Sequence, residues 1–162
     1  FRSRDHHVLS AAMTGPATQH RRPPDVDDAT VEALGKVSEA LETVEAARGH
    51  LYAFHRLCGT ADLTLGEGVD LLREAGHEQH AARLGDEMVG RNILEGRWSF
   101  QVVEEYDDSY YGPFKQLEAD LREALVEGKR HLFEAEMKES RRTADHPHHT
   151  AVPGEVRAAG SD

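Results

Sequence analysis

Apolar residues recur at three- and four-residue steps along much of this chain, which is the period of an amphipathic helix. The clearest stripe begins near Asp28 and ends at Cys58, and Gly59 follows it, a residue type that commonly ends helices. The pattern therefore predicts a first long helix over residues 28–58. Its apolar members are Val31, Leu34, Val37, Leu41, Val44, Leu51, Phe54, Leu57 and Cys58.

A second helix is predicted to begin at Thr64. Thr64 and Glu67 have the spacing of a capping box, in which a hydroxyl and a carboxylate each accept a hydrogen bond from a backbone N–H at the start of a helix. The apolar stripe rotates partway along this helix, which implies one neighbour early and another late. We expect the helix to end near Gly90, or at Gly96 at the latest. The two parts of the stripe are Leu65, Val69 and Leu72, and then Ala81, Leu84 and Met88.

A third helix is predicted from Pro113, because proline is favoured at the first position of a helix. Arg141 and Arg142 would close its last turn, where positive charge is favoured by the helix dipole. The stripe that we expect to face the core contains Phe114, Leu117, Leu121, Leu125 and Leu132.

These elements predict an all-α fold of three long helices in an up-down-up antiparallel bundle. A long irregular connection, residues 93–112, precedes the third helix, and its Trp98, Phe100 and Val102 alternate with polar residues like a short extended segment. The helical domain would span residues 28–142, between disordered tails at residues 1–27 and 143–162 that contain proline and scattered histidine. Met13 is the expected start of translation.

Composition narrows the range of partners. The chain has 162 residues and a formal net charge of −11, which disfavours nucleic acid and anionic membranes as ligands. No apolar run approaches the roughly 18 residues needed to cross a bilayer. Cys58 is the only cysteine, which excludes an internal disulfide and fits a reducing cytoplasm. The rotating stripe of the second helix needs an additional neighbour, so we expect a homodimer or another protein partner.

The segment from Trp98 to Phe114 combines aromatic and acidic side chains more densely than any other part of the chain. It contains the one Trp, three of the four Tyr and two of the five Phe. Aromatic residues supply large contact areas at protein interfaces, and the carboxylates would favour a cationic partner. The alternative is that the aromatic rings fill the core of a bundle. The candidate surface consists of Trp98, Phe100, Glu104, Glu105, Tyr106, Asp107, Asp108, Tyr110 and Tyr111.

Histidine is the residue type that could provide a metal site. All three predicted helices place at least one imidazole near their apolar stripe, and Glu74 and His77 have the spacing that puts both on one helical face. Such ligands would suit zinc or non-haem iron. An isolated histidine on an apolar face more often hydrogen-bonds a neighbour. The ligands of this alternative are His55, Glu74, His77, His80 and His131.

No catalytic motif supports an enzyme. Cys58 is predicted at a helix end, where the dipole would raise the pKa of its thiol. Ser99 and Ser109 lack the context of a nucleophilic serine, and no glycine loop has the sequence of a phosphate-binding loop. The sequence therefore favours a small, acidic, non-enzymatic binding or assembly module without a cofactor, and a zinc- or iron-containing helical bundle is the alternative.

Overall fold

The computed structural model describes residue 16 and residues 18–151, which fall into two compact units. Unit 1 comprises the described parts of Phe1–Gly35 and Arg122–Asp162, and unit 2 comprises Lys36–Leu121. The regular secondary structure of the described residues is helical, as predicted. In chain order the elements are a short 3-10 helix at Thr18–His20, α1 at Asp28–Glu74, α2 at Glu78–Glu87, α3 at Ser99–Tyr106, a π-helical turn at Asp107–Tyr111, α4 at Gly112–Val126 and α5 at Leu132–Arg141.

The first helix is longer than predicted, because α1 continues through Gly59 and through Thr64, the expected start of a second helix. Both local signals are overridden by an uninterrupted row of inward-facing residues. The row alternates three- and four-residue steps, the spacing of a helix that packs along another helix. Its members, all buried or half-buried, are Leu41, Val44, Arg48, Leu51, His55, Cys58, Asp62, Leu65, Val69 and Leu72.

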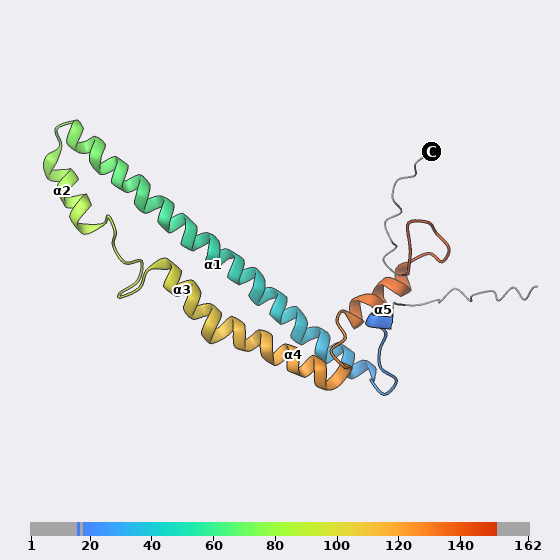
Figure 1. Ribbon diagram of the computed structural model, residues 1–162. Helices are drawn as coiled ribbons and strands as arrows, with labels where there is room; N and C mark the ends of the chain where they lie inside the picture. The colour runs from blue at the N-terminus through green and yellow to red at the C-terminus, as the bar shows by residue number, and fades with distance from the viewer. Residues whose placement is uncertain (1–15, 17, 152–162) are drawn as a thin grey trace, which may run out of the picture. The chain divides into compact units, whose positions relative to one another are not determined.

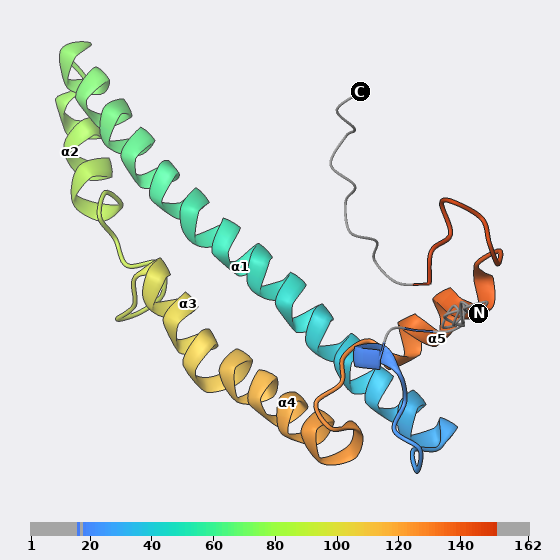
Figure 2. The same ribbon diagram turned by 45° about the vertical axis from the view of Figure 1, so that its right-hand side comes forward.

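Three polar residues of this row bond to the segment that packs opposite. Arg48 pairs with Asp107, the His55 ring bonds to the Ser99 hydroxyl, and Asp62 accepts a hydrogen bond from the backbone N–H of Gly90. The partner number falls as the α1 number rises, so the two segments are antiparallel. Figure 1 and Figure 2 both show α3 and α4 beside α1 within unit 2. These three half-buried polar side chains are thus satisfied across the interface.

The end of α1 explains the rotating stripe. Gly76 has a φ of +84°, and the N–H groups of Gly76 and His77 donate to the carbonyls of Arg73 and Leu72. This is the Schellman pattern that terminates a helix at glycine. The chain then turns back as α2, so the two parts of the stripe belong to two helices. As expected, the second of them ends before Gly90.

The irregular connection predicted before Pro113 is instead helical. α3, the π-helical turn and α4 follow one another without a break from Ser99 to Val126, and Trp98 to Val102 do not form an extended segment. The π turn lies immediately before Pro113 and widens the helix there. This relieves the clash that a proline ring makes with the carbonyl four residues earlier, so the helix passes through Pro113.

The π turn also keeps two residues directed towards α1. Val103, Asp107 and Tyr111 are spaced four residues apart. In an α-helix each four-residue step rotates the direction of the side chain by about 40° around the helix axis. A π turn has more residues per turn and removes this drift. The N–H of Gly112 closes the turn by donating to the carbonyl of Asp107. A side chain at Gly112 would place its Cβ 2.8 Å from that carbonyl oxygen, so glycine is favoured at this position.

The predicted core face of the third helix is largely on the surface. Leu117 is 69% exposed, and Leu121 and Leu125 are also exposed. Glu118, one residue further around the helix, is buried and accepts a hydrogen bond from Ser38. The side of α4 that packs is therefore offset from the most apolar side. In unit 2 an apolar stripe remains uncovered.

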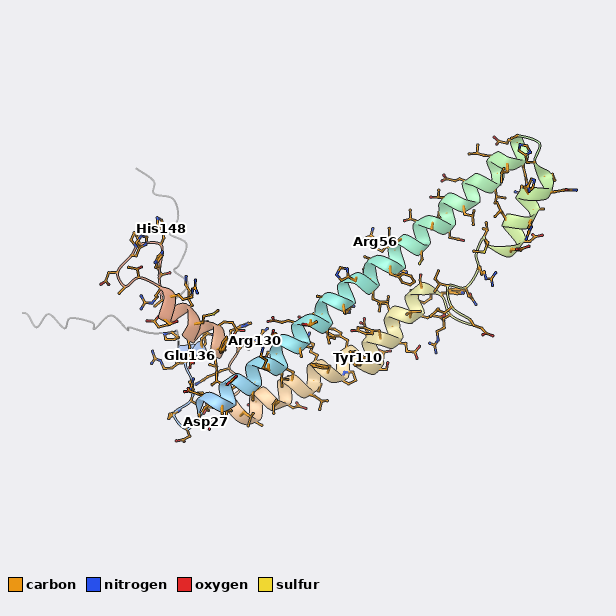
Figure 3. The ribbon with its side chains drawn as sticks, turned by 180° about the vertical axis from the view of Figure 1, so that it is seen from behind. Asp27, Arg56, Tyr110, Arg130, Glu136 and His148 are labelled. Carbon is orange, nitrogen blue, oxygen red and sulfur yellow. The ribbon has the colours of Figure 1, made fainter. Side chains whose placement is uncertain are left out.

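Unit 1 has a small core of its own, and the predicted third helix ends in it. The helix stops at Val126, where Glu127 and Gly128 both have positive φ, and α5 begins at Leu132. A bidentate contact joins Arg22 to Glu136 on α5, with nitrogen–oxygen distances of 2.9 and 2.7 Å. Glu136 is labelled in Figure 3. The core is formed by Val26, Val31, Leu34, Val126 and Leu132.

Asp27 caps α1, because its carboxylate accepts a 2.8 Å hydrogen bond from the N–H of Thr30. This bond lowers the pKa of Asp27. Residues 18–27 thus include ordered contacts, while residues 1–15, 17 and 152–162 of the predicted tails, together with Met13, lie outside the described residues. Within the described part of the chain, no helix combines the length and the apolar character needed to span a membrane.

Candidate functional site

The aromatic residues of the predicted binding surface remain mostly accessible. Trp98 is 58% exposed, Phe100 39% and Tyr110 50%, while Tyr106 and Tyr111 are half-buried. The alternative, in which Trp98 and Phe100 fill the core, is therefore wrong. Tyr110, which is labelled in Figure 3, lies in the π turn.

Trp98 is held in position at the start of α3. Its backbone N–H donates to the Oε1 atom of Gln101 at 2.8 Å. Its ring meets the ring of Phe100 edge to face, with centroids 5.4 Å apart, a favourable geometry for an aromatic pair. The large exposed side chain is thus preorganised, so a partner that binds it loses little conformational entropy.

A tight turn leads into Trp98. Leu94 and Arg97 exchange two backbone hydrogen bonds, and Gly96 between them has a φ of +70°, which glycine adopts without strain. The guanidinium of Arg97 then pairs with the carboxylate of Glu105 on α3. Leu94 itself is 54% exposed. The turn that leads into Trp98 therefore also carries an exposed apolar side chain.

A groove of about 620 Å³ adjoins Trp98 within unit 2. Two hydrogen bonds hold its walls, from Gly90 N–H to Asp62 at 2.7 Å and between the His55 ring and Ser99 at 2.8 Å. Its volume falls within the usual range for ligand sites, about 300–1,000 Å³. The lining comes from α1 (Cys58, Gly59, Ala61, Asp62, Leu65), from the segment after α2 (Met88, Gly90, Arg91, Asn92, Ile93) and from the start of α3 (Trp98, Ser99).

We refer to Met88, Ile93, Leu94, Trp98 and Phe100 as the Trp98 surface. Its first three members are not expected from the sequence pattern, which places Met88 on a helix face and Ile93 and Leu94 in a connection. The signal was available, because Ile93 and Leu94 stand between Gly90 and Gly96, where a surface loop would ordinarily be polar. Each of the three is at least 40% exposed.

The four carboxylates of the predicted surface do not act together. Asp107 is bound by Arg48 through two contacts of 2.6 and 2.8 Å, which lower the pKa of Asp107. Glu105 pairs with Arg97. Two of the four charges are thus compensated inside the protein, which leaves Glu104 and Asp108 exposed to attract a cation.

Tyr111 belongs to the contact between α1 and the π turn, and it is not a free anchor. Its hydroxyl donates to Glu45 at 3.1 Å, and the guanidinium of Arg48 lies 5.4 Å from the centre of its ring. Lys115 lies 5.7 Å from the same ring centre. Tyr111 and Asp107 therefore hold the two helices together, and their role in the predicted surface is structural.

The residues of the metal alternative are distributed over both units. His55 is half-buried and bonded to Ser99, whereas His77 lies in the turn after α1, with its ring centre 6.5 Å from that of His80. Glu74 is the last residue of α1, so it does not share a helical face with His77 as predicted. Within the described part of the chain, no three His, Cys, Asp or Glu side chains are grouped to hold a metal ion.

His131 and Cys58 also differ from prediction. His131 belongs to unit 1, where it precedes α5 in a left-handed conformation and lies outside any helix. Cys58 lies well inside α1 and lines the groove, so the helix-end argument about its thiol does not apply. The groove offers apolar contact area, one thiol and a few polar groups. This composition suits binding of an apolar group.

No family model matches this chain, and no curated protein and no solved structure matches it either.

Proposed function

We propose that this protein is a non-enzymatic binding module that holds an apolar segment of a partner protein on the Trp98 surface. The observation that carries the proposal is the exposure of Trp98, an aromatic residue fixed by a backbone hydrogen bond and a ring contact at the edge of a groove. A buried Trp removes about 150–250 Å² of its own surface from water, which makes it an effective anchor.

The charge of the partner follows from the carboxylates that remain exposed. Among the described residues, no arginine contacts Glu104 or Asp108 as Arg97 and Arg48 contact Glu105 and Asp107, so the rim beside the apolar surface is acidic. We expect a partner segment in which apolar side chains are flanked by Lys or Arg. Such rim charges mainly affect the association rate, and their contribution falls as salt increases.

Site-specific photo-cross-linking in cells tests the proposal. A photoreactive phenylalanine analogue at position 98 is expected to capture a discrete partner, identified by mass spectrometry. The same analogue at Leu63, which is 73% exposed on α1 but does not line the groove, is expected to capture none. Binding of the identified partner, reconstituted from purified components, should then be lost in Trp98→Ala and retained in Leu63→Ala.

Two results would contradict the proposal. Equal capture from both positions would show that exposure alone accounts for the cross-links. Loss of helicity or of cooperative melting in Trp98→Ala would assign the tryptophan to the fold. We expect both to be nearly unchanged, because a residue that is 58% exposed contributes little to the core.

A further inference from the structure

One face of unit 2 combines exposed apolar residues with an absence of carboxylates. On α1 it consists of two rows of residues at seven-residue intervals. The first row is Ala40, Ala47, Phe54, Ala61 and Gly68. The second row is Thr43, His50, Leu57, Thr64 and Leu71. Neither row contains an acid, although the chain has a net charge of −11.

The acidic residues of this stretch occupy other positions of the helix. Between residues 36 and 71, all of them described, the carboxylates are Glu39, Glu42, Glu45, Asp62, Glu67 and Asp70. Phe54 is 43% exposed, Leu57 68% and Leu71 64%. We call the two rows, together with the neighbouring stripe described next, the Phe54 face.

The uncovered stripe of α3 and α4 lies on the same flank of the helix pair. Tyr106, Tyr110 and Phe114 form a chain of ring contacts with centroids 5.4 and 6.2 Å apart, and the exposed Leu117 and Leu121 continue it. Glu45, Tyr111 and Lys115 mark the opposite flank, because the hydroxyl of Tyr111 bonds to Glu45 and its ring lies near Lys115. Turning each antiparallel helix by about 100° per residue places both the Phe54 row and the Tyr110 stripe on the other flank.

The first row is symmetric about Phe54, with two small residues at seven-residue intervals on each side. In an antiparallel contact between two identical helices centred on Phe54, Ala47 of one copy meets Ala61 of the other, and Ala40 meets Gly68. Small residues allow helix backbones to approach closely, and a two-fold interface requires this kind of self-complementarity. In the second row Thr43 would lie close to Thr64 of the other copy, and His50 would lie close to Leu57.

We propose that two copies of this chain pack through the Phe54 face, with α1 antiparallel to α1 around a two-fold axis beside Phe54. The distribution of carboxylates on the chain favours a second copy of the chain as the partner on this face. Two chains of net charge −11 repel each other, and they can approach where each lacks carboxylates. The Phe54 face adjoins the groove beside Trp98, because Ala61 lines that groove, and Met88 belongs to the Trp98 surface. The inference nevertheless does not depend on the proposed function.

The same two-fold axis would bring the second copy over the rest of the Phe54 face. His55 lies level with Ser99, so the axis passes near the start of α3. The Tyr110 stripe of one copy is then carried over α2 of the other, where Leu84 and Met88 are 37% and 46% exposed. The resulting assembly has two packed layers of two helices each, and neighbouring helices are antiparallel.

The size of the face is sufficient for a stable dimer. From Ala40 to Leu71 it extends about 45 Å at 1.5 Å per residue, and two helices side by side are about 20 Å wide. Full coverage would bury about 900 Å² per copy, compared with about 800 Å² per partner in a stable interface of standard size.

Sedimentation equilibrium of the full chain tests the proposal, with Tyr52 as the matched control. Tyr52 and Phe54 are exposed aromatic residues two positions apart on α1, but Tyr52 lies on the opposite flank. We expect the wild type to dimerise reversibly and Phe54→Glu to weaken dimerisation by at least about 30-fold, the loss of a central anchor. Tyr52→Glu should dimerise like the wild type. A monomeric wild type, or equal effects of both substitutions, would overturn the proposal.

The antiparallel register has its own test, which holds even if a charged variant is poorly folded. In a Cys58→Ser background, a short bismaleimide should link Ala47→Cys chains to Ala61→Cys chains when the two are mixed. Ala47→Cys alone should give little product, because its two thiols would be about 20 Å apart along the helix axes. Cross-linking of Ala47→Cys to itself, or none in the mixture, would refute this register.

Discussion

Replacing Gly112 by alanine tests the origin of the π-helical turn. Gly112 has a helical φ of −58°. In an ordinary helix interior a Gly→Ala change at such a φ stabilises the protein by about 1 kcal/mol, because alanine loses less backbone entropy on folding. Here the added Cβ would lie 2.8 Å from the carbonyl oxygen of Asp107, well inside van der Waals contact. Overpacking of this kind costs about 1–3 kcal/mol.

The two effects oppose each other, so the expected net change is a loss of about 1 kcal/mol. Gly49 provides the control, because it is also inside a helix, α1, but an added Cβ there has no atom within 4 Å. Gly49→Ala should therefore gain about 1 kcal/mol. The free energies of unfolding of the two variants are expected to differ by about 2 kcal/mol. This difference is the cost of the steric overlap at Gly112, because the gain from replacing glycine is common to both.

Urea unfolding monitored by far-UV circular dichroism measures both changes from the midpoint and slope of the transition. A second arm repeats Gly112→Ala in an Arg48→Ala background. If the Cβ acts by displacing Asp107, part of its cost is the loss of the Arg48 contact, and the two substitutions will be less than additive. Equal stabilisation by the alanines at positions 112 and 49 would refute the steric account of the π turn.

The remaining predictions concern charge and metal content. The Arg48 contact lowers the pKa of Asp107 below its ordinary value of 3.8, so the stabilisation by this pair is complete above pH 3.8 and is lost as the pH falls through the lowered pKa. The stability difference between wild type and Asp107→Asn should therefore disappear in acid, and denaturant unfolding at a series of pH values measures it. Arg22→Ala should weaken the attachment of α5 by about 1 kcal/mol, seen as roughly fivefold faster amide exchange in α5. Elemental analysis of untagged protein tests the metal alternative, for which stoichiometric zinc or iron would be required.

Several features of the fold could be predicted from local sequence patterns. The start of α1 at Asp28, the all-helical fold and the end of the second helix before Gly90 followed from apolar periodicity and capping residues. These signals act within a few residues of the chain, so they can be interpreted without knowledge of the neighbours. The Trp98 segment was also recognised as a surface candidate, because its composition is distinctive.

Other features depended on contacts between distant residues. Gly59 and the Thr64–Glu67 pair are local signals for a helix end and a helix start, yet α1 passes through both. Burial of one long row against α2, α3 and α4 outweighs a glycine penalty of about 1 kcal/mol. The row could have been noticed as a continuation of the spacing from Cys58 to Leu65, but its polar members Arg48, His55 and Asp62 concealed it.

The sequence also did not show which of the four carboxylates Glu104, Glu105, Asp107 and Asp108 are paired with an arginine. Asp107 and Asp108 are adjacent and chemically identical, but the π turn directs only Asp107 to Arg48. Nothing in the composition of this segment separates the two. The assignment of Leu117 and Leu121 to the core failed for a related reason, because the packed side of α4 is determined by its partner and includes the buried Glu118.

By itself the sequence determined that the chain is helical, where α1 begins and which segments are rich in apolar or charged residues, since helix propensity, capping and periodicity are properties of neighbouring residues. Only the tertiary structure decided which side of each helix is buried, which carboxylates are compensated and where a π turn lets the chain pass a proline. These outcomes depend on the relative height and rotation of segments that are far apart in the chain, such as those of Ser38 and Glu118, which are 80 residues apart, and local sequence contains no record of that geometry.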